Sequence, residues 1–281
     1  MERVGVVGCG QMGSGIAEVA ARAGYDVRVV ETSPAAVQAG VERLESSLRR
    51  AEKRGRIESA DALLERLEVV EGLDALADRE LVVEAIAEDE EIKTGVFREL
   101  DRVVTDPGAI LASNTSSIPI MKLAVATSRP DQVVGIHFFN PVPVLSLVEL
   151  VPSLMTSDGT LAGARSFVEE GLGKKAIDCQ DRAGFVVNAL LVPFLLSAIR
   201  MMESGFATAE DIDEGLVRGC AHPQGPLALS DLIGLDTVKA VAESMYAEFK
   251  EPLYAPPPLL ARMVEAGLLG KKAGRGFHTY A

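Results

Sequence analysis

A histidine and a glutamate, twelve residues apart, have the types and the setting that acid–base catalysis requires. His137 ends an apolar, strand-like run, and open α/β sheets bind their ligands at the carboxyl ends of strands. Glu149 interrupts the apolar run 147–151, where an unpaired buried carboxylate would be costly. If the two strands are neighbours, Glu149 would fix the tautomer of His137 and stabilise its cation. The alternative is that Glu149 lies on an exposed edge strand and faces water.

The chain has only two other histidines, and both are weaker candidates for a general base. His222 directly precedes Pro223 and is expected to be structural. His278 lies close to the C-terminus and is expected to be exposed and inert. A general base of the histidine type is therefore expected at His137.

A glycine-rich loop near the N-terminus has the pattern of a dinucleotide-binding turn. It lies between a strand-like run and a helix-like segment, Ile16–Arg22, and consists of Gly8, Cys9, Gly10, Gln11, Met12 and Gly13. The first glycine permits a tight turn, the second lets backbone amides approach a pyrophosphate, and the third allows close packing of helix on strand. The helix N-terminus then directs its partial positive charge at the phosphates. This context makes a plain strand–helix turn the weaker interpretation.

An acidic residue at the end of the second predicted strand indicates which dinucleotide binds. Glu31 follows Gly13 by 18 residues, a spacing at which a carboxylate can accept hydrogen bonds from both ribose hydroxyls of NAD. The carboxylate would repel the 2′-phosphate of NADP, and no arginine follows it, since Thr32 and Ser33 come next. A solvated acid at a strand end is the alternative, but the spacing favours NAD as the cofactor.

Strand-like and helix-like segments alternate through the first part of the chain, which is typical of βαβ units and a parallel sheet. Several strands, such as the run 81–83, are apolar on both faces, as a central strand covered by helices on both sides must be. The sequence therefore predicts an α/β fold with a Rossmann-type, doubly wound, mostly parallel sheet. The expected strands are Arg3–Gly8, Asp26–Glu31, Leu67–Glu71, Leu81–Ile86, Ala109–Thr115, Val133–Phe139 and Leu147–Pro152, with a further candidate at Lys174–Cys179.

The strand pattern ends near residue 183, which predicts a Rossmann-like domain at 1–183 and a smaller all-helical C-terminal domain at 184–281. Helices are expected at Phe185–Ser204, Ala209–Arg218 and Leu227–Phe249, separated by glycine and proline. The stretch 183–199 carries no charge, but Asn188 and Pro193 interrupt it and it is short of the ~20 apolar residues of a membrane span. A buried helix at a core or subunit interface, and hence a homodimer through this domain, is expected.

Composition excludes several classes of function. With 48% hydrophobic and 25% charged residues, the chain is typical of a soluble globular protein. A formal net charge of -13 repels polyphosphate, so no nucleic acid partner is expected, and no membrane association either. Cys9, Cys179 and Cys220 are odd in number and far apart, which fits neither a disulfide framework nor a zinc site. A metal-free protein of the reducing cytoplasm is expected.

Further motifs give the chain a specific family resemblance. The motifs are Ser113-Asn114-Thr115-Ser116-Ser117, His137-Phe138-Phe139-Asn140-Pro141-Val142-Pro143 followed by Glu149, Asp181-Arg182-Ala183-Gly184-Phe185-Val186-Val187-Asn188, and Gly270-Lys271-Lys272-Ala273-Gly274-Arg275-Gly276-Phe277. Together they resemble the 3-hydroxyacyl-CoA dehydrogenase family along nearly the whole chain. The length is similar to that of its short-chain, 3-hydroxybutyryl-CoA branch. The resemblance implies hydride transfer between NAD and the C3 of a short acyl-CoA.

The resemblance also implies roles for individual residues. The implied catalytic set is Ser116, His137, Glu149 and Asn188, of which Ser116 and Asn188 would contact the substrate oxygens. The implied cofactor contacts are Glu88, Lys93, Asn140 and Lys272, and the implied CoA contacts are Ser47 with Lys53 or Arg54. The alternative for Ser116 is a turn residue and for Asn188 the polar start of a helix, but their occurrence together with His137 favours the catalytic roles.

A basic run between Arg43 and Arg56 is the local exception to the acidic composition. It contains six basic residues against Glu45 and Glu52, with Glu42 just before it, and such a run is usually a solvated helix face. In a protein this acidic, it is also where the anionic phosphates of CoA could bind.

Two other functions compete with the dehydrogenase assignment. A β-hydroxyacid dehydrogenase of the 6-phosphogluconate type would use a catalytic lysine, whereas His137 and Glu149 hold the expected places here. A non-catalytic protein that kept the fold would not need the complete set of catalytic residues. One departure from the family pattern concerns the acyl side of the pocket, where this chain has Ala221-His222-Pro223-Gln224 and the family often has Asn-His-Pro-Met.

Overall fold

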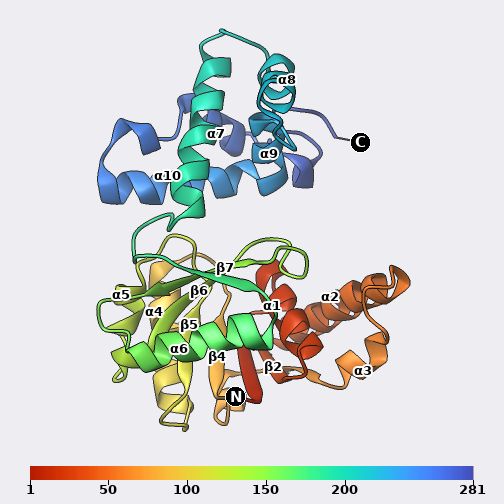
Figure 1. The fold of residues 1–281 in the computed structure, drawn as a ribbon, viewed down its shortest axis with the longest axis vertical. Helices are drawn as coiled ribbons and strands as arrows, with labels where there is room; N and C mark the ends of the chain where they lie inside the picture. The colour runs from red at the N-terminus through yellow and green to blue at the C-terminus, as the bar shows by residue number, and fades with distance from the viewer. Residues whose placement is uncertain (281) are drawn as a thin grey trace. The chain divides into compact units, whose positions relative to one another are not determined.

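Eight strands form one sheet in the order β3-β2-β1-β4-β5-β6-β7-β8 (Figure 1). The strands are β1 (Arg3–Val7), β2 (Asp26–Glu31), β3 (Leu67–Glu71), β4 (Leu81–Glu84), β5 (Ile110–Ser113), β6 (Val133–Phe138), β7 (Leu147–Pro152) and β8 (Lys175–Asp178). The first six run parallel, β7 is antiparallel to β6, and β8 is parallel to β7. The order 3-2-1-4-5-6 is that of the Rossmann fold. The predicted Rossmann-type, mostly parallel sheet is confirmed, and each strand lies within two residues of its predicted bounds.

The computed structural model describes residues 1–280. The chain divides into two compact units, of which the first is Met1–Asp181 and the second begins at Arg182. The division lies two residues before the boundary predicted from the sequence. The sheet belongs to the first unit, together with the helices α1 (Gln11–Arg22), α2 (Pro34–Lys53), α3 (Ala60–Leu64), α4 (Glu90–Val103), α5 (Ile120–Ala124) and α6 (Asp158–Ser166). A π-helical turn, Phe167–Gly171, continues α6.

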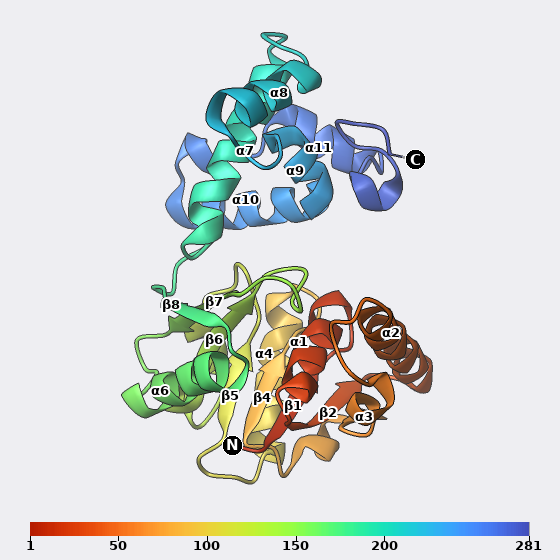
Figure 2. The same ribbon diagram turned by 45° about the vertical axis from the view of Figure 1, so that its right-hand side comes forward.

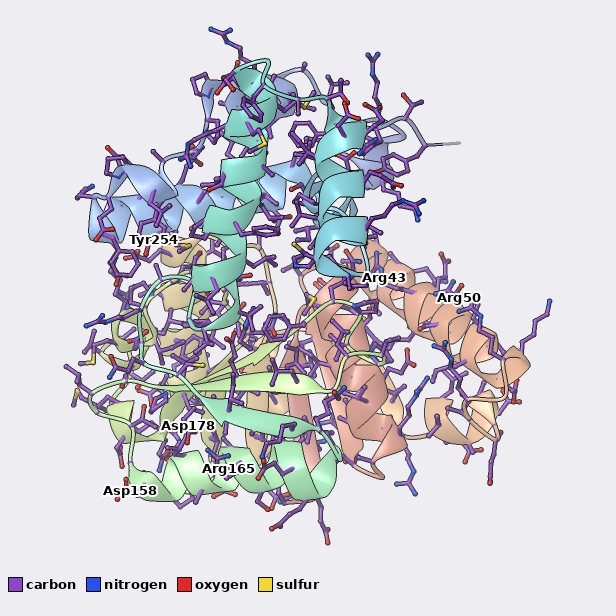
Figure 3. The ribbon with its side chains drawn as sticks, turned by 45° about the horizontal axis from the view of Figure 1, so that its top comes forward. Arg43, Arg50, Asp158, Arg165, Asp178 and Tyr254 are labelled. Atoms are coloured by element: carbon purple, nitrogen blue, oxygen red, sulfur yellow. The ribbon has the colours of Figure 1, made fainter. Side chains whose placement is uncertain are left out.

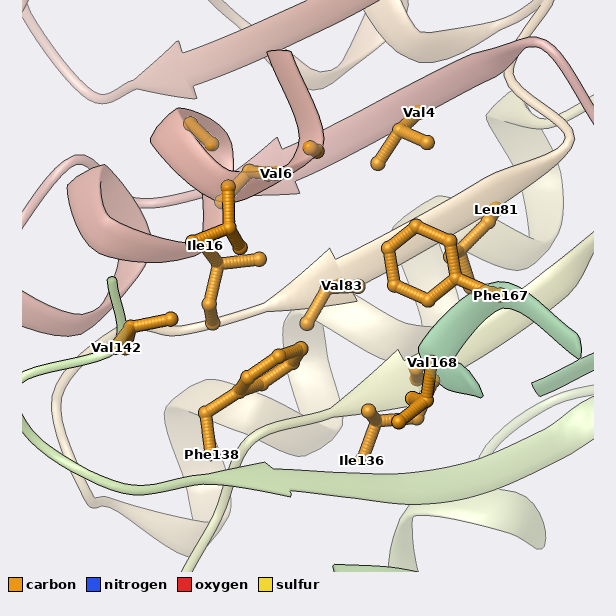
Figure 4. Close-up of a cluster of buried hydrophobic side chains, with 14 of the residues drawn as sticks. Val4, Val6, Ile16, Leu81, Val83, Ile136, Phe138, Val142, Phe167 and Val168 are labelled. Atoms are coloured by element: carbon orange, nitrogen blue, oxygen red, sulfur yellow. The ribbon is translucent and has the colours of Figure 1, made fainter. Parts of the chain in front are cut away.

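One face of the sheet buries an apolar core of the first unit. In Figure 1, α1 and α6 lie in front of the sheet, and Figure 4 shows Ile16 of α1 and Phe167, from the turn after α6, packed with strand residues. Phe138 of β6 and Val142, in the loop after it, belong to the same cluster. Successive strand residues point to opposite faces, so His137 lies on the other face from Phe138.

The other face is closed near His137 by α5. Gly135 of β6 leaves room for this packing, because an added Cβ would lie 2.8 Å from the Cβ of Val151 and 2.9 Å from the Cδ1 of Ile120. Ile120 is the first residue of α5 and is fully buried. The helix therefore packs closely on β6 two residues before the histidine.

The second unit consists of helices, as predicted (Figure 2). The helices are α7 (Val187–Glu203), α8 (Ala209–Cys220), α9 (Pro226–Ile233), α10 (Leu235–Phe249) and α11 (Pro258–Glu265). They enclose their own apolar core, which includes Leu195, Ile199 and Met245. Within residues 1–280, no helix is both long and apolar enough to cross a membrane.

Two predictions for the second unit were wrong. The single helix expected at Leu227–Phe249 is two helices, α9 and α10, because Gly234 between them has φ +101° and cannot continue a helix. His278, expected to be exposed, is partly buried: its side chain is only 22% exposed, and its Nε2 lies 2.8 Å from the Oδ2 of Asp213. Asp213 also accepts hydrogen bonds from the backbone N–H groups of Leu227 and Ala228, so His278 is part of a structural network.

Candidate active site

His137 and Glu149 form a buried pair on the neighbouring strands β6 and β7, at the carboxyl end of β6. They are direct register partners across the antiparallel strands β6 and β7, and the His137 Nδ1 lies 2.7 Å from the Glu149 Oε2. Glu149 is fully buried and His137 is 6% exposed. A carboxylate on Nδ1 fixes a neutral imidazole as the tautomer with its proton on that nitrogen, and it stabilises the imidazolium after proton uptake.

The position of β7 excludes the alternative interpretation of Glu149. β8 pairs with β7 on the side away from β6, with Glu149 opposite Ile177, so Glu149 lies on an interior strand and does not face water. The Phe139 ring packs edge-on against the imidazole, with 4.7 Å between the ring centroids. The histidine is therefore held from two sides at the carboxyl end of β6.

The glycine-rich loop has the backbone geometry of a phosphate cradle. Gly8 adopts φ +91°, which side chains disfavour, and a Cβ on Gly13 would lie 1.9 Å from the Gly8 carbonyl oxygen. Gly10 has open space where a Cβ would be, and no side chain caps α1, which begins at the next residue. The helices α2 and α4 instead begin with side-chain caps from Ser33 and Asp89. The first N–H groups of α1 are thus left for a ligand.

Glu31 is held against this loop. Its Oε1 accepts a hydrogen bond of 2.6 Å from the Cys9 backbone N–H, at the point where β2 ends beside β1. The Cys9 thiol is buried, which raises its pKa to about 11 with a further contribution from Glu31 and an opposing one from Arg43. Cys9 is therefore a neutral thiol at neutral pH. The acidic side chain beside the loop is that of Glu31.

A cavity of about 740 Å³ opens at the carboxyl ends of β1, β2, β4 and β5. Most of the predicted cofactor residues line it, namely Gly8, Gly10, Gln11, Met12, Glu31, Glu88 and Lys93, and so does Ser116. Gly13 does not line it; this glycine permits the tight packing under the loop. The volume is within the range of ligand-binding pockets.

Behind this cavity lies a polar cluster that the sequence analysis only partly anticipated. The Glu84 carboxylate, fully buried at the end of β4, accepts hydrogen bonds from the Lys93 ammonium at 2.8 Å and the Ser113 hydroxyl at 2.6 Å. Lys93 also lies 2.9 Å from the Glu88 Oε2. The signal for Glu84 was a single acid at the end of the apolar run 81–83, the same signal that drew attention to Glu149.

Glu88 orders the loop that carries Ser116. Its Oε1 accepts hydrogen bonds from the Thr115 hydroxyl and from the backbone N–H groups of Ser116 and Ser117. Burial raises the pKa of Glu88, but the positive charge of Lys93 and the hydrogen bonds from Thr115, Lys93 and Ser117 outweigh burial, so the pKa lies below its ordinary value. Glu88 is therefore a carboxylate at neutral pH.

Asn114 connects the Ser116 loop to the histidine strand. Its side-chain oxygen accepts a 2.9 Å hydrogen bond from the Phe138 backbone N–H, next to His137. Asn114 also lines the large cavity, a role that the sequence analysis did not assign to it. Because β5 and β6 run parallel, this bond places Ser116 and His137 at the same edge of the sheet.

A second cavity, of about 450 Å³, lies between α1, α2 and the loop 140–143. Ser47 and Asn140 line it, and Gln11 lines both cavities, so the two adjoin. Arg43 and Arg50, which project from α2 in Figure 3, line it as well. Lys53 and Arg54, predicted as CoA contacts from the same basic run, are both exposed, and neither lines this cavity. Arg43 and Arg50 lie on the side of α2 that faces this cavity.

The Ser47 hydroxyl already has an acceptor in this second cavity. It donates a 2.6 Å hydrogen bond to Glu18 Oε2, and Glu18 is 2% exposed and paired with Arg22. With its proton committed to Glu18, Ser47 can only accept a hydrogen bond from a ligand.

The remaining predicted site residues belong to the second unit. Asn188 lies in the first turn of α7. Lys272 is in the short turn Lys271–Ala273, and its ammonium is 2.6 and 2.7 Å from the two carboxylate oxygens of Asp236. Among the residues that the structure describes, no group of histidine, cysteine and acidic side chains could hold a metal ion.

Known proteins resemble this chain over its full length. Residues 3–182 match the family model described as 3-hydroxyacyl-CoA dehydrogenase, NAD binding domain, and residues 184–280 match the model of the C-terminal domain of the same enzymes. A protein of Mycobacterium tuberculosis named 3-hydroxybutyryl-CoA dehydrogenase is 60% identical, over 100% of this chain and 99% of its own length. The human mitochondrial hydroxyacyl-coenzyme A dehydrogenase is 40% identical over 100% of this chain and 91% of its own.

Solved structures agree with these similarities. The crystal structure of M. tuberculosis FadB2 is 60% identical and matches with a TM-score of 0.99, covering 100% of this chain and 99% of its own. That of (S)-3-hydroxybutyryl-CoA dehydrogenase PaaH1 from Ralstonia eutropha is 45% identical, with a TM-score of 0.93 and the same coverage. The chain therefore belongs to the 3-hydroxyacyl-CoA dehydrogenase family.

Proposed function

We propose that this protein interconverts (S)-3-hydroxybutyryl-CoA and acetoacetyl-CoA, using NAD(H). The observation that carries the proposal is the buried His137–Glu149 pair, at the edge of a Rossmann sheet where a dinucleotide cavity opens. Relatives at 60% and 45% identity carry the name 3-hydroxybutyryl-CoA dehydrogenase. The reaction in the oxidative direction removes a hydride from C3 and a proton from its hydroxyl.

The residues of the large cavity fit NAD. The cradle at Gly8, Gly10 and Gly13 admits a pyrophosphate against the uncapped start of α1, and Glu31 offers carboxylate oxygens where β2 ends. NAD, when bound, supplies the hydride acceptor. Glu88, Lys93 and Lys272 are proposed as its further polar contacts, with Asn140 at the adjoining cavity. Glu31 favours NAD over NADP because a 2′-phosphate would meet like charge.

His137 is proposed as the general base. Glu149 engages its Nδ1, so the nitrogen that exchanges a proton with the substrate hydroxyl is Nε2. Alkoxide character develops on the oxygen as the C3 hydride departs, and a base that takes the proton in step lowers the barrier. Glu149 stabilises the resulting imidazolium. Ser116 and Asn188 are proposed to hydrogen-bond the substrate oxygens and hold C3 in position.

The second cavity is the proposed site for part of CoA. Arg43 and Arg50 supply positive charge for its phosphates, and Ser47 supplies an acceptor for one of its N–H or O–H groups. Lys53 and Arg54, at the C-terminal end of the same helix, remain part of the proposal as further positive charge.

A homodimer of the reducing cytoplasm is proposed as the working form. Residues on and just after α7 expose large apolar side chains, with Leu190 74% and Phe206 79% exposed. Such a surface in a unit of this size favours burial against a second copy. Within residues 1–280 the three cysteines form no disulfide bond, as a reducing compartment favours. Light scattering at micromolar concentration tests the dimer, and a monomer would refute it.

Nicotinamide absorbance tests the proposed activity. Acetoacetyl-CoA should oxidise NADH in the presence of the enzyme, and free acetoacetate should be a far poorer substrate, since it lacks the CoA that binding requires. A protein that binds NADH without turning over acetoacetyl-CoA would support the non-catalytic alternative. Turnover of small hydroxyacids in place of the CoA thioester would support the 6-phosphogluconate-type alternative.

A further inference from the structure

We infer that Lys174 is a positioning residue, which holds the loop 139–146 in the conformation that forms the second cavity and places Asn140 beside it. Nothing in the catalytic scheme uses this lysine, because it contacts neither cavity. Its role follows from the two loop carbonyls that its ammonium binds and from the cavity-lining residues that this loop carries.

The Lys174 ammonium donates two hydrogen bonds to carbonyls of one loop. The acceptors are the carbonyl oxygens of Val142 at 2.8 Å and Leu145 at 2.6 Å. Within the loop, the N–H groups of Val144 and Leu145 both donate to the Pro141 carbonyl. The loop is therefore a tight turn whose outward carbonyls are satisfied by a cation from a distant part of the chain.

The Lys174 side chain is partly buried in the first unit. Lys174 is half-buried, just before β8, and its backbone N–H donates to the Val168 carbonyl at 3.0 Å. Burial lowers the pKa of Lys174, and the positive charge of Arg22 lowers it further. Although partial burial and Arg22 disfavour the charged ammonium, its positive charge strengthens its hydrogen bonds to the two carbonyls.

The loop forms one wall of the second cavity. Its residues Asn140, Pro141, Val142 and Pro143 line that cavity opposite α1 and α2. Val142 packs so closely on α1 that a Cβ on Gly15 would lie 2.9 Å from the Val142 Cβ. The loop begins directly after β6, two residues beyond His137. A small displacement of the loop would therefore change the cavity shape and the direction of Asn140.

Lys175 is a matched control. It is the adjacent residue, its side chain is 73% exposed, and its ammonium pairs with Glu169 at 3.2 Å on the surface. Its own link to the loop is a backbone bond, from its N–H to the Ser146 carbonyl at 2.7 Å, which a side-chain substitution keeps. Lys175→Met removes the same charge as Lys174→Met without removing the bonds to the loop.

Hydrogen exchange tests the loop directly and needs no substrate. In Lys174→Met, the amides of Val144 and Leu145 should exchange about ten-fold faster or more than in the parent, since the turn opens locally. In Lys175→Met they should exchange at the parent rate. Equal exchange in Lys174→Met and the parent would overturn the inference.

Kinetics tests the consequence, and this arm rests on the proposed function. Lys174→Met should raise the KM for acetoacetyl-CoA by about ten-fold and lower kcat, as misplaced binding groups do, while NADH affinity changes by less than about three-fold. A merely structural role would lower both affinities together with stability, and that result would count against positioning. A parent that turns over no acyl-CoA would refute the proposed function but leave the exchange result standing.

Conservative variants keep the test valid if Lys174→Met does not fold. The fork of arginine can donate to both carbonyls, so Lys174→Arg should stay close to the parent in exchange rate and in KM. Lys174→Gln has a shorter, neutral donor and should resemble the methionine variant. An arginine variant no better than the glutamine variant would overturn the inference.

Discussion

The His137 imidazole and the Glu149 carboxylate meet across β6 and β7 as direct register partners, 2.7 Å apart. The sheet itself holds the pair, because each residue is fixed by the backbone hydrogen bonds of its own strand. The Phe139 ring, from the loop after β6, is a further contact of the imidazole. The relationship leads to a sharp prediction for each residue.

Replacing Glu149 should lower the rate of the chemical step and leave cofactor binding unchanged. Glu149→Gln should lower kcat by on the order of 10²–10⁴, as for other groups that orient a general base, while the fold and NADH affinity persist. Steady-state kinetics with a melting curve measures this. Glu71→Gln is the control, because Glu71 is an exposed glutamate on the edge strand β3. It should leave kcat unchanged and alter stability by less than about 0.5 kcal/mol.

His137 and Glu149 should act as one unit. His137→Ala should cost at least as much kcat as Glu149→Gln, and the double variant should lose little more than the worse single variant. If the fold-losses in kcat of the two single variants multiply in the double variant, the two residues act independently. A folded Glu149→Gln enzyme with near-normal turnover would remove Glu149 from the site.

Glu31 should set the preference for NADH over NADPH. A like-charge contact at about 4 Å amounts to about 4 kcal/mol at an effective dielectric constant of 20, so the parent should strongly prefer NADH in kcat/KM. Glu31→Ser should narrow the ratio by at least about ten-fold, mainly through a weaker rejection of NADPH. Comparable kcat/KM values for both cofactors in the parent would show that Glu31 does not contact the ribose.

Arg50 and Arg54 should differ although both are exposed arginines near the end of α2. Arg50 lines the second cavity and Arg54 does not. Arg50→Ala should raise the KM for acetoacetyl-CoA by about ten-fold, as expected for one lost charge-assisted hydrogen bond, and Arg54→Ala by less. The effect of Arg50→Ala should shrink at high salt, which screens exposed charge. A larger effect from Arg54 would move the CoA phosphates to the end of the helix.

Glu88 should contribute stability that disappears in acid. Its pKa is lowered from the ordinary 4.5, so between the lowered value and 4.5 the unfolded chain binds a proton that the folded protein does not. The contribution is complete well above pH 4.5 and is lost as the pH falls through the lowered value. The Tm difference between the parent and Glu88→Gln should therefore be constant near neutral pH and decline below about pH 5. A difference that grows in acid would have the wrong sign.

Local patterns of residues determined much of this protein. The glycine-rich loop follows a strand and precedes a helix within a few residues, so the cofactor cradle and Glu31 could be predicted from spacing. The alternation of strands and helices predicted the sheet, because runs apolar on both faces need cover on both sides. His137 and Glu149 stood out as polar residues in apolar strands, where burial demands a partner.

Packing between segments that are distant in the sequence decided the features that local patterns did not specify. Whether Glu149 was interior or exposed depended on β8, whose pairing with β7 no local pattern specifies. The side of α2 that packs on the first unit decided which basic residues line the second cavity, namely Arg43 and Arg50. His278 is hydrogen-bonded to Asp213, which lies 65 residues earlier in the sequence. The sequence shows which side chains need a partner, whereas only the tertiary structure brings distant segments together, because a contact between them depends on the packing of everything between.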